Sequence, residues 1–312
     1  MLGYSETNFL GRGQGLNLSV TTSRDTNEVT FGFSEPSLLG RNLKFKLNGQ
    51  YKATEKASAS YDTQVASISP AIEFPIGDKA RLELRYRLAR EEIVNNGSTA
   101  GVIIAESARG REVTSAIGYS VNYDTRSELS PAGVLLRFSQ DLAGLGGDVK
   151  YISSRGLAVA ETRIFNEEVT LRAVAEGGVV TALGGYQTRV TDRFFGGGSF
   201  RGFERNGIGP RDGGDALGGN MFASVRFEAE FPLGLPEEYG ITGGAFLDMG
   251  SVWGLDYAGA AQGVDSSLRA AGGLAILWNT PIGPLRMNFS RPIKKESFDI
   301  DQEFELTIST KF

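Results

Sequence analysis

Residues 80–90 read ARLELRYRLAR, and their alternation decides the class of fold. Every second residue is apolar, and the residues between them are mostly charged. Because successive side chains of a β-strand point to opposite faces, the pattern predicts a strand with one apolar face. The stretches NLKFKLNGQYK (42–52) and EFELTISTKF (303–312) alternate in the same way. The sequence therefore predicts an all-β protein.

Composition excludes several classes of function. The 312 residues include no cysteine and no histidine, and the formal net charge is -5. Disulfides, zinc–thiolate sites and imidazole-dependent nucleophilic catalysis are excluded, and no carboxylate pair stands out. An acidic chain also argues against a nucleic-acid surface. We expect neither an enzyme with covalent chemistry nor a bound metal or cofactor.

The alternation is also compatible with a membrane. The sequence has no run of about 18 apolar residues that predicts a transmembrane helix, but a transmembrane barrel alternates lipid-facing and lumen-facing residues. Arg81, Arg85 and Arg87 share one face, and a charge facing lipid at mid-bilayer costs about 2–4 kcal/mol. In a barrel these arginines must face the lumen.

The first residues, MLGYSETNFL, lack the basic segment and apolar core of a signal peptide.

The connections favour a transmembrane barrel over a soluble one. Short Pro/Gly turns such as FLGRGQG, SEPSLLGRN, FPIGDKA and NTPIGP alternate with long polar loops. This alternation predicts an antiparallel up-and-down β-barrel with turns at one end and loops at the other, of about fourteen strands of about ten residues. A large soluble barrel or sandwich is the alternative at this point.

The longest strand-poor segment contains GGGSFRGFERNGIGPRD (196–212). An Arg-Gly pair in a glycine-rich loop is compatible with disorder or RNA binding, although the acidic chain has only one such unit. A phosphate-binding loop is weakly supported, because the G-x-G-x-x-G spacing and a following helix pattern are both missing.

This loop carries a resemblance to a known family. Its motif Phe200, Arg201, Gly202 and Phe203 resembles the Val-Arg-Gly-Phe motif in the sixth loop of the BamA family of outer-membrane protein assembly factors. The motif recurs in a superfamily of insertases and secretion barrels. Three later segments match in the same order, GGNMFASVRFEAEFPLG, FLDMGSVWG and LAILWNTPIGPLRMNFSRPI. The resemblance is specific over residues 196–312.

The resemblance implies a lumen site. Loop 193–219 would fold into the barrel, and Arg201 would meet acidic residues on the inner wall. Strand parity places Asp248 and Glu230 on that wall, so we expect Asp248 as the first partner of Arg201 and Glu230 as the second. The planar guanidinium can bind two acceptors at once.

The resemblance also implies how the barrel begins and ends. Family barrels have sixteen strands and follow periplasmic POTRA domains. We therefore expect residues 1–312 to form a barrel domain without POTRA domains, lacking the first strand and part of the second. The seam edge would carry Leu16, Leu18 and Val20. The alternating C-terminal strand resembles the sorting signal of outer-membrane proteins, and its signal residues are Phe304, Leu306, Ile308 and Phe312.

The function implied is that of an insertase of a Gram-negative bacterial outer membrane. Its partners would be unfolded β-barrel clients, the lipid bilayer and assembly lipoproteins, with no cofactor. A client strand would add to the edge at a lateral seam. The alternatives are a polypeptide-secreting barrel of the same superfamily and, in another class, a passive porin or structural barrel.

Overall fold

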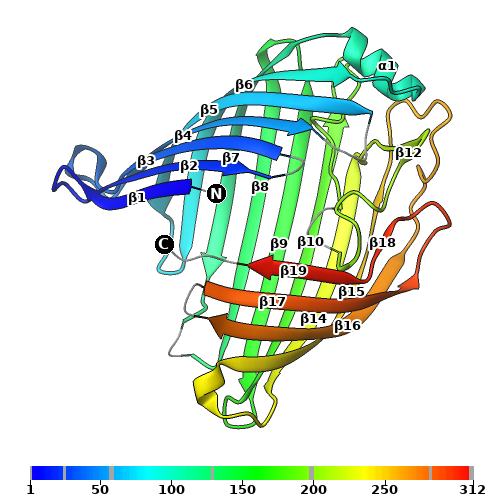
Figure 1. Cartoon of the computed structure of the whole chain (residues 1–312). Coiled ribbons are helices and arrows are strands. Elements are labelled where there is room, and N and C mark those ends of the chain that lie inside the picture. Colours follow the sequence, from blue (N-terminus) through cyan, green and yellow to red (C-terminus); the bar gives the residue numbers. More distant parts are fainter. Residues whose placement is uncertain are drawn as a thin grey trace.

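The computed structural model describes residues 2–23, 26–55, 60–127, 130–196, 200–280 and 283–308. Within these residues, fifteen strands form one curled sheet and are hydrogen-bonded to one another in chain order (Figure 1). All of the pairings are antiparallel, with no crossover, so the predicted up-and-down order is confirmed.

The first ten strands run continuously before the long loop. They are β1 (Leu2–Phe9), β2 (Gln14–Thr22), β3 (Thr26–Glu35), β4 (Lys44–Glu55), β5 (Tyr61–Pro75), β6 (Ala80–Asn95), β7 (Glu112–Asp124), β8 (Ala132–Gly147), β9 (Tyr151–Ile164) and β10 (Val169–Ala182). After the loop come β14 (Met221–Pro232), β15 (Ile241–Trp253), β16 (Arg269–Thr280), β17 (Gly283–Lys294) and β19 (Phe304–Ile308).

The remaining elements are short. They are the strands β11 (Gly202–Phe203), β12 (Arg211–Asp212), β13 (Asp215–Ala216) and β18 (Asp301–Gln302), the helix α1 (Gly101–Ala108), and the 3₁₀ turns η1 (Leu38–Gly40) and η2 (Glu237–Tyr239). Among the described residues, no helix is long and apolar enough to cross a bilayer.

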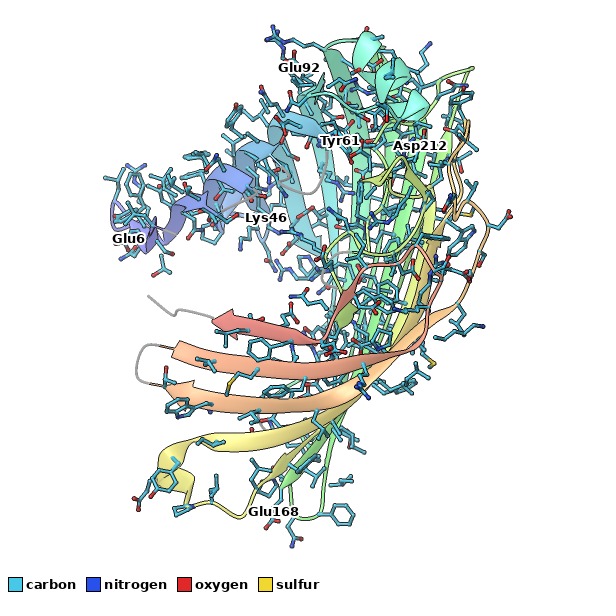
Figure 2. All side chains as sticks on the ribbon, turned by 45° about the vertical axis from the view of Figure 1, so that its right-hand side comes forward. Glu6, Lys46, Tyr61, Glu92, Glu168 and Asp212 are labelled. Atoms are coloured by element: carbon cyan, nitrogen blue, oxygen red, sulfur yellow. The ribbon has the colours of Figure 1, made fainter. Side chains whose placement is uncertain are left out.

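The two ends of the sheet differ as predicted, but not strictly. Helix α1 and Asp212 lie at the loop end, and Glu168, in the β9–β10 turn, lies at the opposite end (Figure 2). The connections β2–β3 and β8–β9 at the loop end are nevertheless as short as turns. The predicted strict alternation of short and long connections is therefore wrong. The meander stays regular because successive strands of the sheet pair antiparallel whatever the length of the connection.

The edges of the sheet correct one prediction. Strand β1 pairs with β2 from Leu2 opposite Val20 to Phe9 opposite Gln14, so Leu16, Leu18 and Val20 lie in the second strand and not at the edge. The described residues also form a sheet of fifteen strands instead of about fourteen. The stretch LGYSETNF was not predicted as a strand, because half of its residues are polar. Within the described residues, β1 and β19 are the two edges, and no pairing joins them (Figure 1).

The two faces of the sheet follow the predicted parity. Leu84, Tyr86 and Leu88 are exposed on the outer face. On the inner face, the Nε and Nη2 groups of Arg85 donate to the two oxygens of Asp141 over 2.9 and 2.6 Å. Arg87 likewise donates to Glu91 over 2.9 Å. The outer face is thus apolar and the inner face is charged and paired.

The dry interior lies where the long loop meets the inner wall. Phe194, Phe200, Phe203 and Ile208 of the loop cluster with wall residues such as Val252. A second cluster forms beneath α1. The loop therefore supplies much of the core that a barrel wall alone lacks.

Candidate functional site

Loop 183–220 leaves β10 at the loop end and returns to β14, and its Phe-Arg-Gly-Phe motif lies against β14, β15 and β17 on the inner face. Phe200 is 5% exposed and packs on Gly250 of β15. A Cβ atom at Gly250 would lie 2.3 Å from the Phe200 ring, so only glycine allows this approach. The motif is fixed to the wall on its aromatic side.

Arg201 binds Asp248 as the sequence predicts. Its Nε donates to Oδ2 over 2.8 Å, its Nη2 donates to Oδ1 over 2.7 Å, and its backbone N–H donates to Oδ2 over 3.0 Å. Asp248 is 1% exposed. The Arg201 guanidinium carbon also lies 3.7 Å from the centre of the Phe246 ring. Burial alone would lower the pKa of Arg201, but Asp248 and Glu228 raise it above its usual value.

The second acceptor is Glu228 and not Glu230. Arg201 Nη1 donates to Glu228 Oε2, whereas Glu230 accepts a 2.7 Å hydrogen bond from the Thr242 hydroxyl. The prediction for Glu230 is therefore wrong. Glu228 lies opposite Phe246 and Glu230 lies opposite Gly244, one inward position farther from the motif. Two residues along a strand cover about 7 Å, which is beyond the reach of the same guanidinium.

Glu228 extends the site toward the last strand. Arg286 of β17 donates to both Glu228 oxygens, over 2.9 and 2.7 Å. Arg286 Nε also donates to Asn288 Oδ1 over 2.9 Å, and Asn288 Nδ2 donates to Glu305 of β19 over 3.0 Å. A continuous polar chain thus runs from the loop motif across β14 and β17 to β19. Its members at 286 and 288 were not identified from the sequence, although parity places both on the inner face.

The motif also pairs with the approach to the last strand through its backbone. Gly202 lies opposite Gln302 and Phe203 opposite Asp301, as β11 and β18. The N–H of Glu204 donates to Ile300 O over 2.9 Å, and the N–H of Ile300 donates to Gly207 O over 2.9 Å. Gly202 has φ +88°, and a Cβ there would lie 2.6 Å from Ala271 Cβ. The glycine is required both by its conformation and by its contact.

Within the residues that the structure describes, strand β19 covers Phe304–Ile308. It pairs with β17 from Phe289 opposite Phe304 to Leu285 opposite Ile308. Phe304 and Leu306 are each 50% exposed on the outer face, where strand parity places them. Their role as a C-terminal signal stays a prediction. Phe312 lies outside the described residues. A polar cavity of about 260 Å³ separates the motif from β19 and is lined by Arg201, Arg205, Gln302 and Glu305 together with the motif aromatics.

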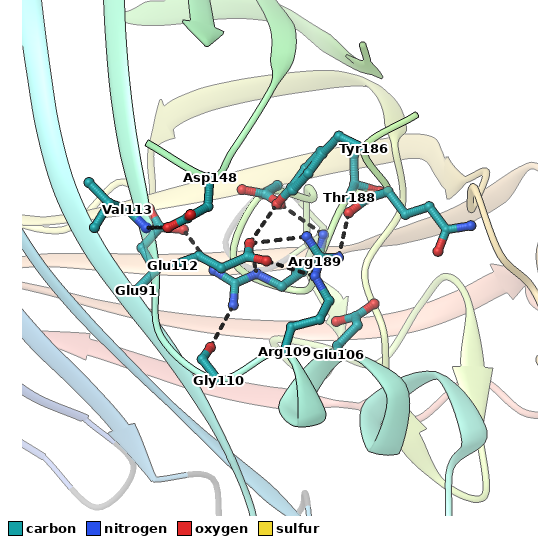
Figure 3. Close-up of polar contacts among 12 residues, drawn as sticks. Glu91, Glu106, Arg109, Gly110, Glu112, Val113, Asp148, Tyr186, Thr188 and Arg189 are labelled. Carbon is teal, nitrogen blue, oxygen red and sulfur yellow. Dashed lines mark hydrogen bonds and ion pairs between the residues drawn. The ribbon is translucent and has the colours of Figure 1, made fainter. Parts of the chain in front are cut away.

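The base of the loop has its own buried ionic cluster (Figure 3). Arg189 is fully buried, with Nε 3.0 Å from Glu112 Oε2 and Nη2 3.9 Å from Glu91 Oε2. Its Nη1 donates to the Gly110 carbonyl over 3.1 Å. Close by, Arg193 donates to Glu106 of α1 over 2.7 Å. The sequence analysis did not identify this cluster, because it joins residues far apart in the chain.

Asp192 lies in the same cluster. Its Oδ2 accepts hydrogen bonds from the Tyr186 hydroxyl over 2.7 Å and from the Arg189 N–H over 2.8 Å. Burial, together with the Glu91 carboxylate, raises the pKa of Asp192 to about 6. The loop is thus held at its base by titratable groups and at its tip by an arginine that remains charged.

The chain is similar to known proteins over most of its length. A family model described as the Omp85 superfamily domain matches residues 8–312. The chain is 29% identical over 283 residues to the outer membrane protein assembly factor BamA of Neorickettsia risticii, covering 89% of the chain and 37% of that protein. It is 28% identical over 320 residues to the sorting and assembly machinery component 50 homolog A of Xenopus laevis, covering 96% and 66%.

The solved structure of BamA from Haemophilus ducreyi lacking POTRA domains 1–3 superposes with a TM-score of 0.83. The two chains are 22% identical, and the match covers 99% of this chain and 66% of that one. This likeness supports the transmembrane up-and-down barrel fold. The chain spans less than half the length of the Neorickettsia relative.

Proposed function

The chain belongs to the Omp85 superfamily, and from this premise we propose that it folds and inserts other β-barrel proteins into the outer membrane. The chain is itself an outer-membrane β-barrel. Its proposed clients are unfolded outer-membrane proteins. The proposed accessory partners are assembly lipoproteins.

The connection between the loop motif and the last strand carries this proposal. Arg201 is bound to the wall through Asp248 and Glu228, and the same motif pairs with β18 next to β19. The described part of β19, Phe304–Ile308, pairs with β17, and the motif pairs with β18 directly before it, so both contacts position this strand. A motif that positions an edge strand suits a protein that offers this edge to a client by strand addition.

We propose that no covalent step is involved and that the free energy comes from folding of the client. A client strand would satisfy the unpaired backbone groups of an edge that otherwise faces lipid, where each unpaired group costs several kcal/mol. The chain has no histidine or cysteine to support the common nucleophilic mechanisms.

The test is insertion of a urea-unfolded client barrel into liposomes. Liposomes would carry this chain, its Arg201→Ala variant, its Arg111→Ala variant or no protein. Arg111, between α1 and β7, has an exposed side chain that pairs with Glu92 and does not line the cavity at the motif, so it serves as the control. Acceleration that Arg201→Ala loses and Arg111→Ala retains supports the proposal. No acceleration by the parent chain contradicts insertase activity for the barrel on its own.

Single-channel conductance separates the alternatives. A passive porin gives large stable openings, whereas a barrel occupied by loop 183–220 gives small and irregular ones. A secretion barrel of the same superfamily would transport an unfolded polypeptide into the liposome lumen without inserting it. Protease protection of the client distinguishes transport from insertion.

A further inference from the structure

The short turns share a feature that the lumen site does not use. At the end opposite α1, several turns place a bulky apolar residue directly before a glycine. The described examples are Leu10-Gly11, Leu39-Gly40, Ile76-Gly77 and Leu233-Gly234. Leu10 is 75% exposed and Leu39 is 88% exposed. Side chains that contact so little protein contribute almost nothing to its core.

Two of these leucines also have an unfavourable backbone conformation. Leu10 has φ +56° before Gly11 at +69°, and Leu39 has φ +54° before Gly40 at +70°. Consecutive positive φ angles are typical of tight hairpin turns whose first position favours asparagine, aspartate or glycine. A leucine there costs about 1–2 kcal/mol. The contacts of the described fold therefore give no reason for leucine at either position, and a contact outside the chain would account for it.

A third turn also has an exposed apolar residue at positive φ, although asparagine and not glycine follows it. Phe165, between β9 and β10, has φ +51° and is 73% exposed. The three turns belong to the separate hairpins β1–β2, β3–β4 and β9–β10. A protein partner would contact one arc of this rim, whereas a bilayer surrounds all of it. The distribution therefore favours lipid.

Charge supports the same partner. Arg12 and Arg41 each follow the leucine by two residues and are exposed. An apolar side chain beside a cation matches the membrane interface, where the apolar group enters the acyl boundary and the cation meets lipid phosphate. The outer face directly above the turns is already apolar, with Leu18, Val29 and Phe31 exposed on β2 and β3.

We propose that Leu10 with Arg12, and Leu39 with Arg41, are interfacial anchors that bind the phospholipid layer at the short-turn rim, next to edge strand β1. Phe165 anchors the opposite arc. The anchors fix the depth of the β1 edge in the bilayer. This inference depends on the location of the barrel in a membrane and not on insertase activity.

The chain has no cysteine, so single labels can be placed at will. Leu10→Cys, Leu39→Cys and, as control, Tyr257→Cys would each carry a nitroxide in the full chain, folded into vesicles containing phosphatidylglycerol. Tyr257 is an exposed apolar residue at the loop end. We expect labels at 10 and 39 to be more accessible to oxygen than to a water-soluble nickel complex, and the label at 257 to show the reverse. Labels at 10 and 39 that behave like 257 overturn the proposal and leave a protein partner as the occupant.

A second variant tests whether the two leucines raise or lower the stability of the protein in vesicles. Asparagine suits a positive φ better than leucine, so the double variant Leu10→Asn/Leu39→Asn should raise the urea midpoint of unfolding in vesicles if the turns serve the fold alone. The anchors predict a lower midpoint. The Arg12→Gln/Arg41→Gln variant should lose the gain in midpoint that phosphatidylglycerol gives the parent chain. An unchanged or raised midpoint for the leucine variant contradicts the proposal.

Discussion

Asp248 accepts hydrogen bonds from both the guanidinium and the backbone N–H of Arg201. One nearly fully buried carboxylate therefore fixes the orientation of the side chain and the position of the main chain at the tip of the loop. The Nη1 group of Arg201 is left to donate to Glu228, and the guanidinium stacks over the Phe246 ring. The geometry of this pair leads to the first prediction.

Lysine should not replace Arg201. Arg201→Lys keeps the charge but loses the two-pronged contact with Asp248 and the stacking on Phe246. We expect the free energy of unfolding to fall by about 1.5–3 kcal/mol, which is typical of a hydrogen bond to a charged group. We also expect an insertion rate closer to that of Arg201→Ala than to that of the parent chain. The liposome assay measures this rate, with Arg111→Lys as control. Full activity of Arg201→Lys would show that charge alone suffices.

The two inward glutamates of β14 should differ. Glu228→Gln removes the carboxylate that joins Arg201 to Arg286, and losing one partner of a largely buried ion pair costs about 3–5 kcal/mol. Glu230→Gln keeps a hydrogen-bond acceptor for Thr242, and we expect a change within about 0.5 kcal/mol. Urea unfolding in vesicles compares the two variants directly. Equal midpoints would contradict the assigned role of Glu228.

Gly202 should tolerate no side chain. Gly202→Ala combines φ +88° with a contact of 2.6 Å to Ala271 Cβ, so β11 should move away from β18. The amides of Glu204 and Ile300 should then lose protection from hydrogen exchange, because both donate across this junction. Gly156→Ala is the control, since an added Cβ there meets nothing within 4 Å. Retained protection in Gly202→Ala would mean that the pairing does not need this glycine.

The base of the loop should weaken as pH rises. The pKa of Asp192 in the folded protein is about 6, above the value of 3.8 for an unperturbed aspartate. The folded state therefore holds more protons between these values, and its stability falls as pH rises from about 4 to about 6 and is level above that. The free energy of unfolding falls by at most about 3 kcal/mol over this range.

This pH dependence can be followed at one amide. The N–H of Arg189 donates to Asp192, so its protection factor should fall over the same pH window. Asp192→Asn should abolish the dependence while keeping an acceptor for Tyr186 and Arg189. A protection factor that varies equally in the variant would assign the titration to another group.

The sequence predicts part of this site. Strand parity and the family motif together identified Arg201 and Asp248, because parity needs only the face of a strand. Parity cannot tell which of Glu228 and Glu230 contacts Arg201, because both lie on the same face of β14. The register of β14 against β15 decides it, since Glu228 is the residue opposite Phe246. The Arg189 cluster was missed for a related reason. It joins Glu91, Glu112 and Arg189, which only the folded loop brings together.

The sequence separations within the loop contacts set an order of assembly. Arg201 is 27 residues from Glu228 and 47 from Asp248, so strands β10, β14 and β15 are enough to fasten the loop. Pairing of Gly202 with Gln302 requires the last part of the chain. Shorter closures cost less entropy. We therefore expect the loop to dock on a partial sheet first, and the final strand to pair with a surface that has already formed.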